Sequence, residues 1–255
     1  VYKRQKEDKT MSKVIVITGA GVGLGRALAR QFVADGHSVA LLGRTAAKVE
    51  AVAEELGEQA MALGCDISSP DSVRDAFAAI AERHPRVEVL INNAAIFEPY
   101  KIVDASDQQI QSAVATNLMG PMYCARSAIP LMSPGSHIIN VTSESVDMPY
   151  PHLSVYQATK AGAERLSKSL FQELEPEGIR VSTVRAGSMF EEGKGWDVDP
   201  QAAMAFHQEA LARGINLVEK PLSQFTSVAS IFTALIDLPA DLQIQHINLK
   251  ARKPD

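Results

Sequence analysis

The chain has 255 residues, of which 46% are hydrophobic and 22% are charged, and its formal net charge is −5 at pH 7. This composition is typical of a globular domain with a buried core, and the acidic balance argues against a nucleic-acid partner, which calls for basic patches. No apolar run approaches the roughly 18 residues of a membrane span. The two cysteines, Cys65 and Cys124, predict buried free thiols and a reducing, cytoplasmic compartment.

Residues 1–10 differ from the rest of the chain. They are strongly polar, and Met11 follows them directly before an apolar strand pattern. We predict that this segment is a non-native extension, that Met11 is the natural start, and that one domain covers residues 11–255.

Short apolar strands alternate with amphipathic helices in the first part of the chain. Gly36 is expected to end the first helix, and Ser69-Pro70 supplies an N-cap with a proline at the first helical position of the third. The predicted strands cover residues 13–18, 38–43, 59–65 and 87–92, and the predicted helices cover 23–35, 46–56 and 70–83.

The alternation continues to the C-terminus with one interruption. Predicted helices cover 106–131, with a bend near Gly120-Pro121, 154–174 and 223–238, and predicted strands cover 136–142, 179–185 and 243–249. Strands that are apolar on both faces and alternate with helices indicate an α/β fold, a Rossmann-type doubly wound parallel sheet in a single domain. Residues 188–221 interrupt this pattern and are predicted to form a lid on the substrate side.

A glycine-rich turn follows the first predicted strand. Thr18, Gly19, Gly23 and Gly25 form T-G-x-x-x-G-x-G, with Leu24 between the last two glycines. A helix N-terminus beside small residues exposes N–H groups that can bind a phosphate. The turn therefore predicts a dinucleotide site, and a glycine-rich turn without a ligand is the alternative.

Three further strand ends carry candidate cofactor residues. Arg44 lies where an NAD enzyme usually has an acidic residue, and a guanidinium there would attract a 2′-phosphate, so we predict NADP(H) over NAD(H). Asp66 could accept the adenine amino group, with Ile67 lining the ring, and Asn93-Ala94 would let the backbone pass close to the cofactor. The alternatives are a solvated helix start for Arg44 and a turn cap for Asp66.

Tyr156 and Lys160 lie four residues apart, with Ser143 thirteen positions before the tyrosine. The spacing puts both side chains on one helix face, where an ammonium would lower the tyrosine pKa from about 10. Asn117 is a further polar candidate in a helical segment. Alone, the Tyr/Lys pair could mark a surface helix, Ser143 a turn cap and Asn117 a helix bend.

Taken in this order, the motifs resemble the classical short-chain dehydrogenase/reductase family over residues 13 to about 187. The resemblance implies that Tyr156 donates or accepts the proton and that Lys160 lowers its pKa and holds the nicotinamide ribose. Ser143 would bind the substrate oxygen, and Asn117 would hold a water in a relay to Lys160. Gly187 would lie beside the cofactor, although Ala186 replaces the usual proline before it.

The family implies an NADP(H)-dependent oxidoreductase acting on a carbonyl/alcohol pair, assembled as a homodimer or homotetramer. A non-catalytic NADP-binding redox sensor, or an isomerase or dehydratase on the same scaffold, is the alternative. The six histidines show no metal-ligand spacing, so no metal site is expected. Aromatic and Met residues in the predicted lid suggest closure over a fairly apolar substrate; they are Phe190, Trp196, Met204 and Phe206.

Overall fold

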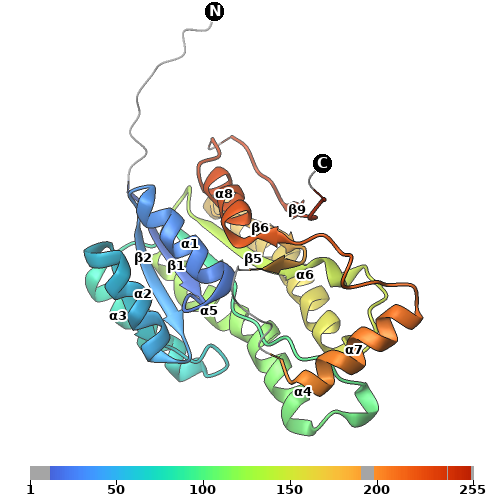
Figure 1. Cartoon of the computed structure of the whole chain (residues 1–255). Helices are drawn as coiled ribbons and strands as arrows, with labels where there is room; N and C mark the ends of the chain where they lie inside the picture. Colours follow the sequence, from blue (N-terminus) through green and yellow to red (C-terminus); the bar gives the residue numbers. More distant parts are fainter. Residues whose placement is uncertain (1–11, 191–197, 240, 254–255) are drawn as a thin grey trace, which may run out of the picture.

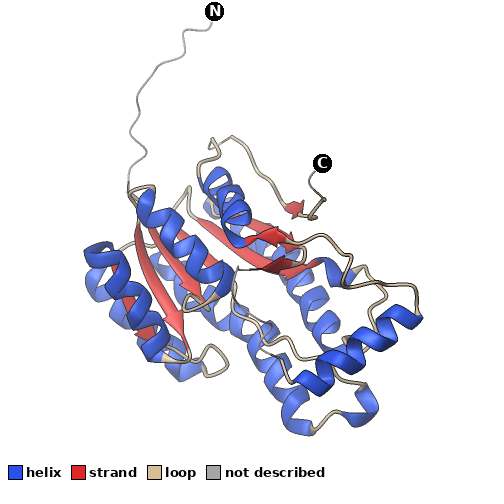
Figure 2. Ribbon diagram, in the orientation of Figure 1, coloured by secondary structure: helices blue, strands red, loops and turns tan. Residues whose placement is uncertain are grey.

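The computed structural model describes residues 12–190, 198–239 and 241–253. The predicted extension at 1–10 and Trp196 of the predicted lid lie outside this described part. A seven-stranded parallel sheet forms the centre of the molecule, in the order β3-β2-β1-β4-β5-β6-β9, and helices cover both of its faces (Figures 1 and 2). This is the predicted Rossmann-type α/β fold in one domain.

The observed elements follow the predicted alternation closely. The strands of the main sheet are β1 (Val14–Thr18), β2 (Ser38–Gly43), β3 (Ala60–Gly64), β4 (Val89–Asn92), β5 (His137–Ser143), β6 (Arg180–Ala186) and β9 (His246–Asn248). The α-helices are α1 (Gly23–Ala34), α2 (Ala46–Leu56), α3 (Pro70–Arg83), α4 (Asp107–Val114), α5 (Gly120–Ala128), α6 (Ser154–Leu174), α7 (Pro200–Ala212) and α8 (Phe225–Ile236).

The direction of sheet building reverses between β1 and β4, which are neighbours in the sheet although two strands separate them in the chain. The connections on either side of such a switch point lead away from each other and leave a crevice outside the carboxyl ends of the strands. The glycine-rich turn after β1 and the Asn93-Ala94 segment after β4 meet at this crevice.

Alternate residues of each strand enter different halves of the core. Ile15 and Ile17 of β1 belong to a buried cluster with residues of α1, α2 and α8, whereas Val16 between them packs with residues of α3, α5 and α6. The strands are therefore buried on both faces, which explains why their sequences are apolar throughout instead of alternating. Cys65 and Cys124 are buried free thiols, as predicted, and burial raises the pKa of both.

The helix predicted over residues 106–131 changes its hydrogen-bond pattern in the middle. A π-helical turn covers Ala115–Met119, between α4 and α5. The prediction placed a bend near Gly120-Pro121, and the physical reason is the same: Pro121 has no N–H, so it cannot donate an α-helical bond to the carbonyl of Asn117. Single π-turns of this kind are frequent at functional sites.

Two short strands were not foreseen, one inside the predicted lid and one just after it. β7 (Met189–Phe190) and β8 (Ser223–Gln224) form a small parallel sheet that ties the two ends of the 188–221 segment together. The last strand, β9, is shorter than the predicted 243–249. None of the described helices is long and apolar enough to cross a membrane, and no group of three or more His, Cys, Asp or Glu residues in the described ranges could hold a metal ion.

Candidate active site

The glycine-rich turn after β1 is held against the end of β4. The Thr18 Oγ1 accepts hydrogen bonds from the N–H groups of Asn93 and Ala94, both at 3.0 Å, and the Asn93 side-chain amide donates to the Thr18 carbonyl at 2.9 Å. Gly19 has φ +68°, and a Cβ there would lie 2.9 Å from the Cα of Ala94. Only glycine satisfies both the backbone angle and this close approach.

The start of α1 has the properties of a phosphate site. Its N-cap, Val22, makes no side-chain hydrogen bond to the first turn, so the N–H groups there are not capped by that residue. A Cβ at Gly25 would lie 2.3 Å from the Gly19 carbonyl oxygen, so the helix begins tightly against the turn. The first N–H groups of the helix, which have no carbonyl of a preceding turn to bond, and the positive end of the helix dipole at Gly23 and Leu24 fit the pyrophosphate of a dinucleotide.

The predicted adenosine residues lie at the ends of β2 and β3. Arg44 is exposed directly after β2, where its guanidinium is accessible. Asp66 accepts hydrogen bonds at one oxygen from the N–H of Ser68 at 3.0 Å and from its hydroxyl at 2.7 Å. Asp66 therefore has the alternative role of capping a turn through that oxygen. Ile67 is buried, and the backbone of Gly120 packs directly against it.

Helix α6 brings Tyr156 to the carboxyl end of β5. A side-chain hydrogen bond joins Tyr156 to Ser143, the last residue of β5. The ring of Phe97 packs edge-on against the Tyr156 ring, with their centroids 4.8 Å apart. Burial raises the pKa of Tyr156 to about 12, and the hydrogen bond with Ser143 opposes that rise. The phenol is therefore protonated at neutral pH and can donate its proton.

Lys160 lies one turn further along α6 and is almost fully buried, with 4% of its surface exposed. Its Nζ donates to the Val141 carbonyl at 2.9 Å and lies 5.8 Å from the centre of the Tyr156 ring. Burial lowers the pKa of Lys160 to about 8. The sequence predicted that Lys160 lowers the tyrosine pKa, whereas in the structure burial raises it.

Asn117 connects the π-helical turn to the catalytic helix. Its side chain accepts from the Ile96 N–H at 2.7 Å and donates to the Ile96 carbonyl at 2.9 Å and to the Thr159 hydroxyl at 3.2 Å. Thr159 in turn donates to the Tyr156 carbonyl at 2.7 Å. Sequence reasoning missed Thr159, although its position between Tyr156 and Lys160 placed it on the helix.

A buried ionic network connects α6 to β5 and β6 near the candidate catalytic residues. The Arg185 guanidinium on β6 binds both carboxylate oxygens of Glu164 at 2.6 and 2.7 Å, and the Thr142 hydroxyl donates to Glu164 at 2.9 Å. Arg185 also pairs with Asp147. Glu164 follows Lys160 by four residues on the same helix face, which is the signal that sequence reasoning overlooked.

We expect Glu164→Leu to destabilise the protein by about 3–5 kcal/mol, because it leaves Arg185 without its bidentate partner in a site where the arginine side chain is 14% exposed. Urea unfolding followed by circular dichroism measures the effect. Glu173→Leu, on an exposed position of α6, is the matched control and should change stability by less than about 0.5 kcal/mol. Equal effects of the two substitutions would contradict a supporting role for the network.

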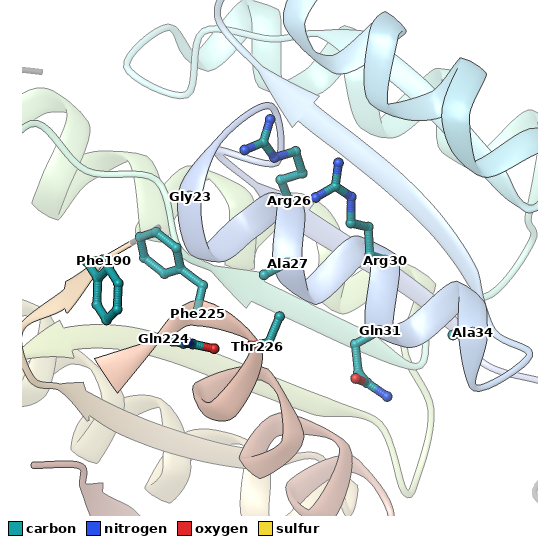
Figure 3. A pocket seen from close by; sticks show the side chains of 10 residues that line it. All are labelled: Gly23, Arg26, Ala27, Arg30, Gln31, Ala34, Phe190, Gln224, Phe225 and Thr226. Atoms are coloured by element: carbon teal, nitrogen blue, oxygen red, sulfur yellow. The ribbon is translucent and has the colours of Figure 1, made fainter. Parts of the chain in front are cut away.

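The described residues among those predicted for the lid, Phe190, Met204 and Phe206, do not form one apolar face. Phe206 is buried, with 3% exposed, and its ring lies 6.1 Å from that of Tyr150, whereas Met204 is 59% exposed. Phe190 lies beside Phe225 near the start of α1 (Figure 3). Gly187 lies close to the β9 end of the chain, where a Cβ would be 2.8 Å from the Leu249 carbonyl oxygen.

A cleft of about 330 Å³ opens between α1 and α8 and reaches Gly23 (Figure 3). Phe190 and Phe225 lie at the end next to Gly23, and Gln31 lies at the other. The aromatic ring of Phe225 would contact a Cβ at Gly23 at 3.5 Å. The cleft therefore adjoins the phosphate end of the predicted cofactor site, and Tyr156 is not among the residues that line it.

A model of the short chain dehydrogenase family matches residues 13–192, a segment that includes every candidate catalytic residue named above. The chain belongs to the short-chain dehydrogenase/reductase family. The matched segment runs from β1 to β7 and leaves out α7, β8, α8 and β9. The motifs quoted from the sequence all lie within the matched segment.

Individual relatives of this dehydrogenase support the same conclusion. A short-chain type dehydrogenase/reductase from Sinorhizobium fredii is 38% identical over 69% of this chain, but that match spans 32% of the relative's length. The NADP-dependent 3-hydroxy acid dehydrogenase YdfG of Salmonella typhimurium is 31% identical over 68% of this chain and 71% of its own. The structure of a 3-ketoacyl-(acyl-carrier-protein) reductase from Brucella melitensis, complexed with NADH, is 27% identical, with a TM-score of 0.77 and coverage of 93% of this chain and 96% of that one.

Proposed function

We propose that this chain is an NADP(H)-dependent oxidoreductase that interconverts a carbonyl compound and the corresponding alcohol. The observation that carries the proposal is the pairing of Tyr156 with Ser143 at the carboxyl end of β5, with Lys160 one helical turn away. The three groups lie on the same edge of the sheet as the glycine-rich turn, which fits the phosphates of a dinucleotide. A bound nicotinamide cofactor supplies or accepts the hydride in such a reaction.

The side chains of this site divide the proton chemistry between them. In the reducing direction, the Tyr156 hydroxyl donates its proton to the substrate oxygen as negative charge develops there, and the Ser143 hydroxyl stabilises the same oxygen by a hydrogen bond. The Lys160 ammonium keeps a positive charge close to the phenolate that remains. Asn117 and Thr159 hold the helix backbone at Tyr156 through their hydrogen bonds.

The preference for NADP(H) rests on Arg44. Its exposed guanidinium follows β2, at the place where a carboxylate would otherwise bind the ribose 2′-hydroxyl, and it offers a bidentate partner for a 2′-phosphate. A named NADP-dependent relative, YdfG, is similar to this chain over two thirds of its length, whereas the Brucella reductase was solved with NADH. The identity of the residue after β2, not membership of the family, is therefore the argument for NADP(H).

Reversing the charge at residue 44 should reverse the cofactor preference. We expect Arg44→Asp to lower kcat/KM for NADPH by at least about 100-fold and to raise it for NADH, because the carboxylate repels the 2′-phosphate and accepts from the 2′-hydroxyl. Initial rates with both cofactors measure the change. Arg74→Asp makes the same charge change on the exposed surface of α3 and should leave the ratio unaltered; an unaltered ratio in Arg44→Asp would remove the argument for NADP(H).

The proposed activity is tested by NADPH oxidation with purified protein across aldehydes, ketones, quinones and sugars. Turnover of at least one carbonyl class is expected. Tight NADPH binding without turnover of any of them would favour the non-catalytic sensor. We further propose a homodimer or homotetramer, as in the family, and sedimentation equilibrium measures the mass.

A further inference from the structure

An ion pair lies beside the catalytic serine, in residues that the chemistry above does not use. Glu144 follows Ser143 directly in the chain, and its Oε1 accepts hydrogen bonds from the Lys220 ammonium and, at 3.2 Å, from the Ser188 hydroxyl. Lys220 also donates to the Tyr150 hydroxyl. The Glu144 side chain is 11% exposed and the Lys220 side chain 21%. Two donors from separate segments, Lys220 and Ser188, thus meet at one carboxylate oxygen, and Tyr150 joins the cluster through Lys220.

The segments that follow the carboxyl ends of the strands set the position of this pair. Ser188 follows Gly187 just beyond the end of β6, and its carbonyl accepts from the N–H of Ser223 at the start of β8 at 3.0 Å. Lys220 comes three residues before Ser223, so the small β7–β8 sheet holds it over the carboxyl ends of β5 and β6. Glu144 is the residue next to Ser143, with Cα atoms about 3.8 Å apart, so the pair lies at the same end of the sheet at which Ser143 and Tyr156 would bind a substrate carbonyl oxygen.

The pair keeps unused hydrogen-bonding capacity. Among the described residues, the second carboxylate oxygen of Glu144 accepts no hydrogen bond and the Tyr150 hydroxyl donates none. An ammonium has three N–H donors, and two of those on Lys220 are accounted for. The site therefore offers one charged acceptor and two donors, while the net charge of the pair is zero.

A hydroxyl group complements this arrangement better than the other common substituents. It can donate to the free Glu144 oxygen and accept from Lys220 or Tyr150 without adding charge. Hydrocarbon in its place would leave those polar groups without partners in a site that the substrate closes to water. A carboxylate would meet Lys220 favourably but would also face Glu144, which repels it.

We propose that Glu144 and Lys220 select substrates that carry a hydroxyl group within about two carbons of the reacting carbonyl, such as α-hydroxy and β-hydroxy ketones. This inference rests on the proposed oxidoreductase function and deepens it. It replaces the fairly apolar substrate suggested by the lid sequence, because the structure buries Phe206 against Tyr150 and leaves Met204 exposed. A site built to bind a substrate hydroxyl rejects analogues that lack it.

The test compares ketones of equal size in which a hydroxyl group is replaced by a methyl group. Hydroxyacetone is paired with 2-butanone and 4-hydroxy-2-butanone with 2-pentanone, and pyruvate represents the anionic class. The wild-type protein should prefer each hydroxy ketone to its alkyl partner by at least about 100-fold in kcat/KM and should disfavour pyruvate. An alkyl ketone or pyruvate used as well as the hydroxy ketone would overturn the proposal.

The double variant Glu144→Leu/Lys220→Met removes both charges together, so neither is left buried without its partner. The preference for the hydroxy ketone should then fall to less than about 5-fold. Lys13→Met/Asp237→Leu removes another partly exposed ion pair, with side chains 21% and 31% exposed, which lies at the amino end of β1. This control should keep the full preference. A preference that survives the Glu144/Lys220 change would overturn the assignment.

A milder variant protects the test against misfolding of the double variant. Tyr150→Phe keeps the ring that packs near Phe206 and removes only the hydroxyl that Lys220 contacts. The kcat/KM for hydroxyacetone should fall several-fold while that for 2-butanone stays the same, and equal losses for both would count against the proposal. Failure of the wild-type protein to reduce any carbonyl would overturn the proposed function itself, a result distinct from reduction without hydroxyl preference.

Discussion

Substitution of Tyr156 by Phe should reduce turnover by about 1,000-fold or more while NADPH binding survives. In the proposed reaction the phenol donates the proton, and its pKa of about 12 keeps it protonated at neutral pH. Phenylalanine retains the edge-on contact with Phe97, so the packing of the site is preserved. Steady-state rates measure the loss, and quenching of protein fluorescence by NADPH measures the binding.

Tyr123→Phe provides the matched control for this experiment. Tyr123 lies on α5 and interacts there with Arg126, outside the catalytic residues. The same chemical change at that position should leave kcat within about two-fold of the wild-type value. A Tyr156→Phe protein that turns over as fast as Tyr123→Phe would end the assignment of Tyr156 as the proton donor.

Replacement of Lys160 by Met should lower kcat by about 100-fold or more and should also change how stability depends on pH. Burial lowers the Lys160 pKa to about 8 from the ordinary 10.5, so between these values the unfolded chain binds a proton that the folded protein does not. Stability therefore rises with pH across this window. The unfolding free energy of the wild type relative to Lys160→Met should increase by roughly 2 kcal/mol from about pH 7.5 to about pH 10.

The comparison of the wild type with Lys160→Met isolates the contribution of Lys160 to the pH dependence of stability. Burial raises the pKa of Tyr156 above its ordinary value of 10, which reduces stability only as the pH rises above that value, and both proteins share this effect. Urea unfolding at the two pH values gives the difference directly. Lys168→Met, on an exposed position two turns along α6, should show no such pH dependence. If the difference in unfolding free energy between the wild type and Lys160→Met were the same at both pH values, the argument from burial of Lys160 would fail.

The local elements of the sheet were predictable because each has a local physical cause. Apolar runs of five to seven residues gave β1, β2, β5 and β6 to within about a residue at each end. The start of α3 follows from Ser69, whose hydroxyl accepts from the Ser72 N–H, and from Pro70 at the first helical position. The short β7–β8 pairing was missed because two-residue strands carry no periodic pattern.

The candidate site was predicted through spacing alone, and spacing does not report burial. Thr18, Gly19, Ser143, Tyr156 and Lys160 lie near the carboxyl ends of the strands, where the sequence predicted the site. The pKa values of Tyr156 and Lys160 do not follow from spacing, because desolvation depends on every element packed around a group. The sequence pattern suggested that the lysine charge would dominate, whereas burial lowers the pKa of Lys160 and raises that of Tyr156.

The sequence by itself determined the alternation of strands and helices, the glycine turn at the start of α1 and the four-residue step between Tyr156 and Lys160. These features depend on neighbours in the chain, through periodicity, backbone angles and helix geometry. Only the tertiary structure decided that Glu164 pairs with Arg185 and that Lys220 reaches Glu144, 76 residues away. Partners so distant in the chain are brought together by sheet order and loop packing, which no local pattern encodes.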